Sequence, residues 1–126
     1  TALDWLQAYN ADAPSCWIAG VSFGAWIGMQ LLMRRPELEG FISVAPPANL
    51  YDFTFLAPCP SSGLIINGTA DRVAPPRDTH ALVDKLHEQK GIAITHEEVE
   101  GAGHLFPMER PLETADRIRR YFLSDL

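Results

Sequence analysis

Three side chains in this sequence have the types and the order needed for nucleophilic catalysis. Ser22, Asp71 and His104 each come after a run of residues that is typical of a strand. A serine hydroxyl attacks a carbonyl group only when a base removes its proton, and a histidine held by a carboxylate is an effective base. We therefore predict that His104 takes the proton from Ser22 Oγ and returns it to the leaving group. Asp71 would fix the imidazole tautomer and stabilise the protonated ring.

The serine lies in the pentapeptide Gly-Val-Ser-Phe-Gly at residues 20–24, between two apolar stretches. A G-x-S-x-G sequence in this context is typical of a nucleophile elbow, a sharp strand-to-helix turn that lifts the serine clear of the backbone. We expect Gly20 and Gly24 to let the strand and the helix approach each other closely, because neither has a Cβ atom. The backbone N–H of Phe23, at the start of the helix, is the predicted oxyanion donor.

The acid candidate could also have a purely structural role, and the base candidate competes with three other histidines. Asp71 could be a turn or capping residue, although several residues separate it from the next predicted helix. His80 and His87 fall within that helix and are expected to form a solvated surface pair, and His96 falls within a predicted strand. Only His104 stands on a glycine-rich loop after a strand, which favours it as the base.

The elements that must position these residues alternate between strand and helix along the chain. This order predicts an open, mostly parallel α/β sheet with helices on both faces, in which ligands bind at the carboxyl ends of the strands. The last strand is the most polar one and is expected at an edge. The predicted strands are 16–21, 40–45, 62–68 and 92–99, and the predicted helices are 1–9, 23–35, 76–90 and one that runs from about Pro111.

The segment 46–60 is irregular and contains four prolines. It is too short for a full lid domain. Its aromatic residues Tyr51, Phe53 and Phe55 are equally consistent with pocket walls and with a loop that packs onto the core.

Composition narrows the range of functions. The 126 residues are 47% hydrophobic and fit a single domain over 1–126. The net charge is −6 without a basic run, which argues against a nucleic-acid partner. A membrane span needs about 18 continuous apolar residues, and the sequence has no such run and no basic leader. Cys16 and Cys59 form no disulfide framework; both are expected to be buried, and a cytoplasmic location fits. We predict no cofactor, and for a metal ion the sequence offers no His or Cys cluster.

Taken together, three motifs resemble those of the α/β-hydrolase superfamily. They are Gly-Val-Ser-Phe-Gly at 20–24, Asn-Gly-Thr-Ala-Asp-Arg-Val-Ala-Pro at 67–75 and Gly-Ala-Gly-His at 101–104. The resemblance covers essentially the whole chain and points to the carboxyl-terminal half of a small bacterial member without a large cap. It implies a serine hydrolase that cleaves a small-molecule carboxylic ester through an acyl-enzyme.

At its N-terminal side the sequence departs from the pattern of the superfamily. The superfamily's sheet has strands before the elbow strand, and a preceding loop supplies a second oxyanion N–H. We therefore expect an α/β-hydrolase fold truncated at its N-terminal side, in which the apolar elbow strand is an exposed edge. A missing N-terminal segment, or a second copy of the chain in a homo-oligomer, is expected to cover that edge.

Two other functions stay open on the sequence. A non-catalytic binding module with this fold is favoured by the missing oxyanion loop. A peptidase, thioesterase or acyltransferase would use the same triad, because fold and triad are shared among several chemistries.

Overall fold

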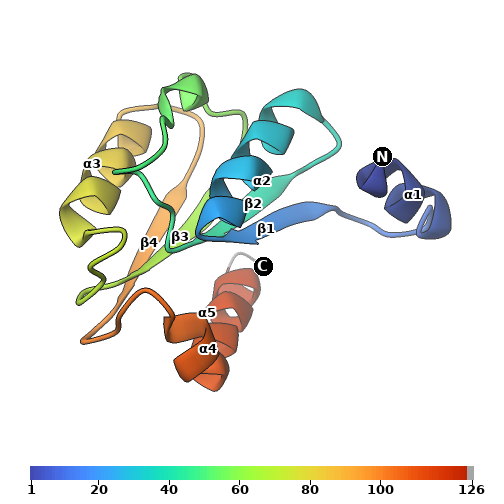
Figure 1. Ribbon diagram of the computed structural model, residues 1–126. Helices are drawn as coiled ribbons and strands as arrows, with labels where there is room; N and C mark the ends of the chain where they lie inside the picture. Colours follow the sequence, from blue (N-terminus) through green and yellow to red (C-terminus); the bar gives the residue numbers. More distant parts are fainter. Residues whose placement is uncertain (125–126) are drawn as a thin grey trace.

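The structure is a computed structural model, and it describes residues 1–124. Four parallel strands form one sheet in the order β1-β2-β3-β4 (Figure 1). The strands are β1 (Trp17–Val21), β2 (Gly40–Val44), β3 (Gly63–Gly68) and β4 (Ile94–Val99). The helices are α1 (Ala2–Tyr9), α2 (Phe23–Arg34), the 3-10 helix η1 (Thr54–Leu56), α3 (Pro76–His87), α4 (Phe106–Glu109) and α5 (Pro111–Ser124).

Helices cover both faces of the sheet. In Figure 1, α2, α3 and η1 lie above it, and α4 and α5 lie below it. Because side chains alternate along a strand, β3 contributes to two cores. Ile65 packs with residues of α2 and α3, whereas Leu64 and Ile66 pack with residues of α4 and α5. The predicted parallel sheet with helices on both faces is therefore confirmed.

The central and outer strands differ in burial. Every residue of β2 and β3 is buried, whereas β1 has no fully buried residue and β4 is buried only at its two ends. Within residues 1–124, β1 and β4 are the two edge strands. The prediction that β4 is a more polar edge strand is thus confirmed. No helix in this part of the chain is long and apolar enough to cross a membrane.

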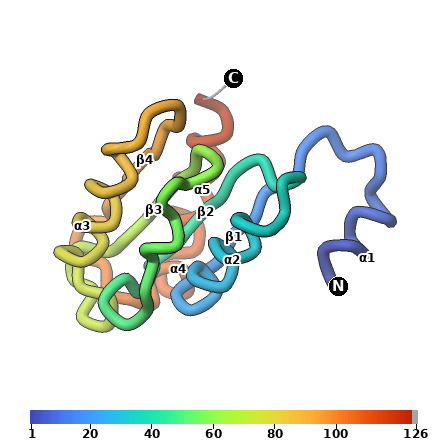
Figure 2. Tube along the Cα trace, turned by 90° about the horizontal axis from the view of Figure 1, so that it is seen from above, coloured from blue at the N-terminus to red at the C-terminus, as the bar shows by residue number. Residues whose placement is uncertain are grey.

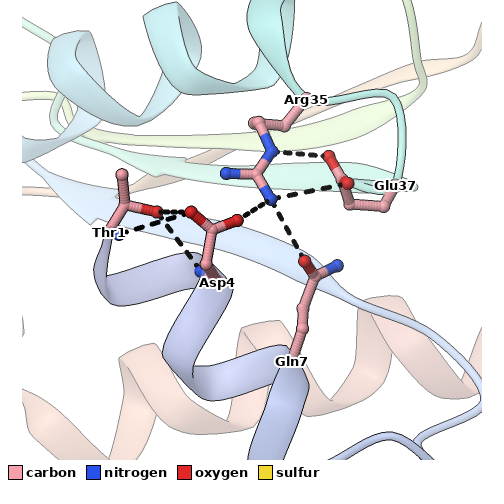
Figure 3. Close-up of polar contacts among 5 residues, drawn as sticks. All are labelled: Thr1, Asp4, Gln7, Arg35 and Glu37. Atoms are coloured by element: carbon pink, nitrogen blue, oxygen red, sulfur yellow. Dashed lines mark hydrogen bonds and ion pairs between the residues drawn. The ribbon is translucent and has the colours of Figure 1, made fainter.

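Charged side chains tie α1 to the turn that precedes β2. The Arg35 guanidinium donates to Asp4 Oδ1 at 2.7 Å, to Gln7 Oε1 at 3.1 Å and to Glu37 Oε1 at 2.8 Å (Figure 3). The Thr1 hydroxyl donates to Asp4, and this bond together with Arg35 lowers the pKa of Asp4 to about 2. These bonds hold α1 beyond the β1 side of the sheet (Figure 2).

Two smaller predictions need correction. The short helix α4 was not predicted, because four residues that include Pro107 carry no helical period. Cys59 is buried as expected, but Cys16 is only half-buried, so the prediction that both cysteines are buried is wrong for Cys16. In the irregular segment, Phe53 packs into the core, which supports the core-packing interpretation for that ring.

Candidate active site

Ser22 occupies a strained turn between β1 and α2. Its φ is 55° and its ψ is −120°, a backbone conformation that costs a non-glycine residue about 1–3 kcal/mol. Its N–H donates to the carbonyl of Val44 at 2.8 Å, which ties the turn to the end of β2. The sharp strand-to-helix turn expected for G-x-S-x-G is therefore present in the structure.

The two glycines that flank the turn are not equivalent. A Cβ atom on Gly20 would run into the backbone of Gly24 and Ala25, so β1 and α2 approach closely only because this side chain is absent. A Cβ atom on Gly24 would meet nothing within 4 Å among the described residues. The expectation that both glycines permit the close approach is right for Gly20 and wrong for Gly24.

The structure brings Ser22, His104 and Asp71 into one hydrogen-bonded line. Ser22 Oγ lies 2.8 Å from His104 Nε2, and His104 Nδ1 lies 2.7 Å from Asp71 Oδ2. An ionised carboxylate only accepts hydrogen bonds, so Nδ1 is the donor and Nε2 is free to accept the serine proton. Ser22 and His104 are 82 residues apart in the chain, yet their side chains are in direct contact.

The Asp71 carboxylate is held by the loop that carries it. Its Oδ1 accepts from the backbone N–H groups of Val73 at 2.9 Å and Ala74 at 2.8 Å, while its Oδ2 receives His104. The Asp71 side chain has no exposed surface, and that of His104 is 13% exposed. Asp71 therefore does stabilise its own turn, as its alternative role predicted, but only Oδ1 is used for this and Oδ2 remains for His104. These two backbone donors were not predicted from the sequence.

Hydrogen bonds join the loop that carries Asp71 (69–75, the acid loop) to the loop that carries His104 (100–105, the histidine loop). Ala70 N–H donates to the Ala102 carbonyl at 3.0 Å, and Gly101 N–H donates to Thr69 Oγ1 at 2.7 Å. A Cβ atom on Gly68 would collide with that same Ala102 carbonyl. The close backbone approach therefore depends on glycine at position 68, and it fixes the separation of the two loops.

Phe23, the predicted oxyanion donor, is the first residue of α2 and directly follows Ser22. The first N–H groups of a helix have no partner within it and carry its positive dipole end, so this N–H suits a developing negative charge. The Phe23 ring lies 5.3 Å from Tyr51 and 5.7 Å from Trp26, measured between ring centroids. Aromatic side chains thus gather beside the elbow.

A groove of about 660 Å³ lies between the segment 48–58 and α3. Its lining includes Tyr51, Phe53, Leu82 and Lys85. Tyr51 belongs both to this groove and to the ring cluster beside the elbow. For Tyr51, therefore, the pocket-wall interpretation is supported.

Comparison with known proteins agrees with this geometry. No protein-family model matches the chain. A candidate α/β hydrolase of unknown function from Agrobacterium tumefaciens is 60% identical, with a TM-score of 0.87 over 99% of this chain and 59% of that one. An α/β serine hydrolase homologue from Coxiella burnetii is 28% identical, with a TM-score of 0.82 over 95% of this chain and 54% of that one. The chain belongs to the α/β-hydrolase superfamily.

Two further comparisons concern the lid and the length of the chain. A serine hydrolase of this superfamily without a lid, from Xanthomonas campestris, is 26% identical, with a TM-score of 0.75 over 94% of this chain and 52% of that one. An uncharacterized protein of Rickettsia prowazekii is 49% identical over 109 residues, which are 83% of this chain and 46% of that protein. The chain thus spans about half the length of these relatives.

The remaining histidines lie in the elements where they were expected, and His80 and His87 are both exposed. Each of these two rings also contacts β4, which was not expected: His80 Nε2 is 2.9 Å from Glu98 Oε2, and His87 Nε2 is 2.9 Å from the Ile94 carbonyl. Burial lowers the pKa of His96, which lies beside His80. His80, His96 and Glu98 lie close enough together to hold a metal ion, a grouping that their spacing in the sequence did not indicate.

Proposed function

We propose that the chain carries the nucleophile, base and acid of a serine hydrolase that cleaves a carboxylic ester. The observation that supports this most is the continuous line from Ser22 through His104 to Asp71, with separations of 2.8 Å and 2.7 Å. Each of the three residues comes from a different loop at the carboxyl edge of the sheet. This is the edge where open α/β sheets bind their ligands.

In the proposed reaction, Ser22 Oγ attacks the carbonyl carbon of the ester while its proton moves to His104 Nε2. The carbonyl oxygen becomes an oxyanion, which the N–H of Phe23 stabilises. The ester C–O bond then breaks, and His104 gives the proton to the departing alkoxide, which leaves as an alcohol. A water molecule next attacks the acyl-enzyme and transfers a proton to His104, which returns it to Ser22 Oγ as the carboxylic acid departs.

Asp71 acts in this proposal by holding His104. Its Oδ2 accepts from Nδ1, which directs the lone pair of Nε2 to the serine and stabilises the imidazolium that forms. The backbone donors of Val73 and Ala74 keep the carboxylate in place. We further propose that the groove beside Tyr51 takes the apolar part of a small ester.

An active-site probe tests the proposal. The complete protein is incubated with a fluorophosphonate, which reacts only with an activated serine. We expect the wild-type protein to be labelled and Ser22→Ala to lose the label. Ser15→Ala, a change of an exposed serine before β1, serves as the matched control and should keep it. Absence of labelling in the folded wild type would contradict the proposal and favour a binding module.

A substrate panel then separates the chemistries that share a triad. Wild-type protein that has not been treated with the probe is assayed with p-nitrophenyl esters of increasing acyl length, an acyl thioester and a peptide anilide. We expect the short esters to give the highest kcat/KM. A preference for the thioester or the anilide would keep Ser22 as the nucleophile but overturn the assignment as a carboxylic ester hydrolase.

A further inference from the structure

A second group of histidine and carboxylate side chains lies between α3 and β4. His80 comes from α3, and His96 and Glu98 come from β4. Residues two apart in a strand point to the same face of the sheet, so His96 and Glu98 both face α3. Each of the three residues offers one ligand atom, and these three atoms lie within 4.8 Å of one another.

We propose that this cluster binds a zinc ion. Two imidazole nitrogens and one carboxylate oxygen are a donor set that zinc prefers, and it leaves a fourth position open for water. Zinc holds such ligands at about 2.0–2.2 Å in tetrahedral geometry, so two ligand atoms on one ion lie about 3.5 Å apart. His80 Nε2 and Glu98 Oε2 lie 2.9 Å apart, and all three ligand atoms lie within 4.8 Å of one another. Zinc binding therefore requires a small side-chain adjustment, which His80 can make because its side chain is 49% exposed.

Asn67 on β3 supports two of the three ligands. Its Nδ2 donates to Glu98 Oε2 at 3.1 Å, and its Oδ1 contacts His96 Nε2. With the amide nitrogen directed at Glu98, Oδ1 accepts from Nε2–H, and the lone pair of His96 is left on Nδ1. Asn67 is fully buried, so it holds both side chains firmly. Metal-binding histidines usually have such an outer hydrogen-bond partner.

The zinc ion would join α3 to β4 and take no part in the chemistry at Ser22. Its ligands lie within a helix and a strand, whereas Ser22, Asp71 and His104 lie on the loops beyond the strands. The inference therefore goes beyond the proposed hydrolysis and does not depend on it. Bound zinc should raise the thermal unfolding midpoint, because it binds the folded arrangement of the three residues.

Calorimetric titration of the chelator-treated complete protein with ZnCl2 tests the site. We expect one ion per chain, and we expect His80→Ala and Glu98→Gln each to weaken zinc affinity by at least about tenfold. His87→Ala is the matched control, since it removes another α3 histidine that also contacts β4. It should leave zinc affinity unchanged, and Mg²⁺ should not compete, because it prefers oxygen ligands.

Cobalt spectroscopy and thermal unfolding complete the test. Co²⁺ in this site should give the intense visible bands of a low-coordinate ion without a thiolate charge-transfer band, which excludes Cys16 and Cys59 as ligands. The unfolding midpoint of the metal-free variants shows that they are folded. Equal zinc affinity in wild type and in both ligand variants, or no zinc binding by the folded wild type, would overturn the proposal and leave only a hydrogen-bonded network.

Discussion

Residues 1–124 contain two histidine–carboxylate pairs with nearly equal separations and very different surroundings. His104 and Asp71 lie 2.7 Å apart, and His80 and Glu98 lie 2.9 Å apart. The side chains of the first pair are 13% and 0% exposed, whereas those of the second are 49% and 34% exposed. A short contact between histidine and carboxylate therefore does not by itself mark a catalytic base. Burial and support from the backbone distinguish the two.

The supports of the two pairs also differ in origin. Backbone N–H groups of the acid loop hold Asp71, and that loop is bonded to the histidine loop. The buried side chain of Asn67 holds Glu98. Backbone donors on adjoining loops can be shaped around a reacting centre, whereas a helix–strand contact has a spacing set by core packing. We therefore expect the first pair to serve proton transfer and the second to serve binding.

Exchanging each carboxylate for its amide tests this difference most strongly. Asp71→Asn should lower kcat for ester hydrolysis by about 10⁴-fold, because the amide stabilises the wrong tautomer of His104. Glu98→Gln in chelator-treated protein should cause a far smaller loss, since that carboxylate is not connected to Ser22. Steady-state kinetics with a p-nitrophenyl ester give both values. Similar losses in the two variants would abolish the distinction between the pairs.

A smaller effect is expected when the serine is displaced from the buried pair. Gly20→Ala forces β1 and α2 apart and moves Ser22, and a displacement of about 1 Å costs about 100-fold in rate. Gly24→Ala is the matched control, because its added methyl meets nothing within 4 Å among the described residues. Kinetics and fluorophosphonate labelling should fall together in Gly20→Ala. If Gly24→Ala were the more damaging change, Gly20 would not be the residue that lets β1 and α2 approach closely.

The junction of the loops that carry Asp71 and His104 should be sensitive to substitution in stability as well as in rate. In Gly68→Ala the added methyl collides with the Ala102 carbonyl, and such overpacking costs about 1–3 kcal/mol in the free energy of unfolding. Gly103→Ala, on the same loop as His104, adds a methyl with nothing within 4 Å among residues 1–124. Denaturant unfolding of the complete protein compares them. Equal stability in the two variants would show that the loops do not need this close approach.

The exposed ion pairs around Arg35 should show the smallest effect. The pKa of Asp4 is lowered to about 2, by the Thr1 hydroxyl first and by Arg35 next. A carboxyl group whose folded pKa is lowered adds stability above its ordinary value of 3.8 and loses it as the pH falls toward about 2. Arg35→Gln should raise the Asp4 midpoint in an NMR titration, while Arg34→Gln should not. An unchanged midpoint in Arg35→Gln would show that Arg35 does not bind Asp4 in solution.

Much of the fold was predictable because strands and helices follow from patterns of neighbouring residues in the sequence. Three short apolar runs and one more polar run predicted strands close to their observed bounds, and the helix from Pro111 begins where expected. The sequence also placed Ser22, Asp71 and His104 each on the turn or loop that follows a predicted strand. The helix α4 was not, because four residues are too few to show a period.

The contacts that support Asp71 and that bring His80 to Glu98 could not be predicted from neighbouring residues in the sequence. The backbone donors of Val73 and Ala74 carry no side-chain signature, so their bonds to Asp71 could not be anticipated. Likewise, the contact of His80 with Glu98 depends on how α3 is rotated and shifted on β4. That arrangement is set by core packing of Val83 and Leu86 on α3, and not by the histidine itself.

The sequence by itself determined which reactive side chains this α/β-hydrolase chain contains and which strand precedes each of them. This was possible because apolar periodicity and turn residues act over short distances in the chain. Only the tertiary structure decided which groups meet. It placed Ser22 against His104 across 82 residues, buried one histidine–carboxylate pair and left the other partly open to solvent. The physical reason is that distances and burial arise from packing between elements distant in the chain, which no local pattern encodes.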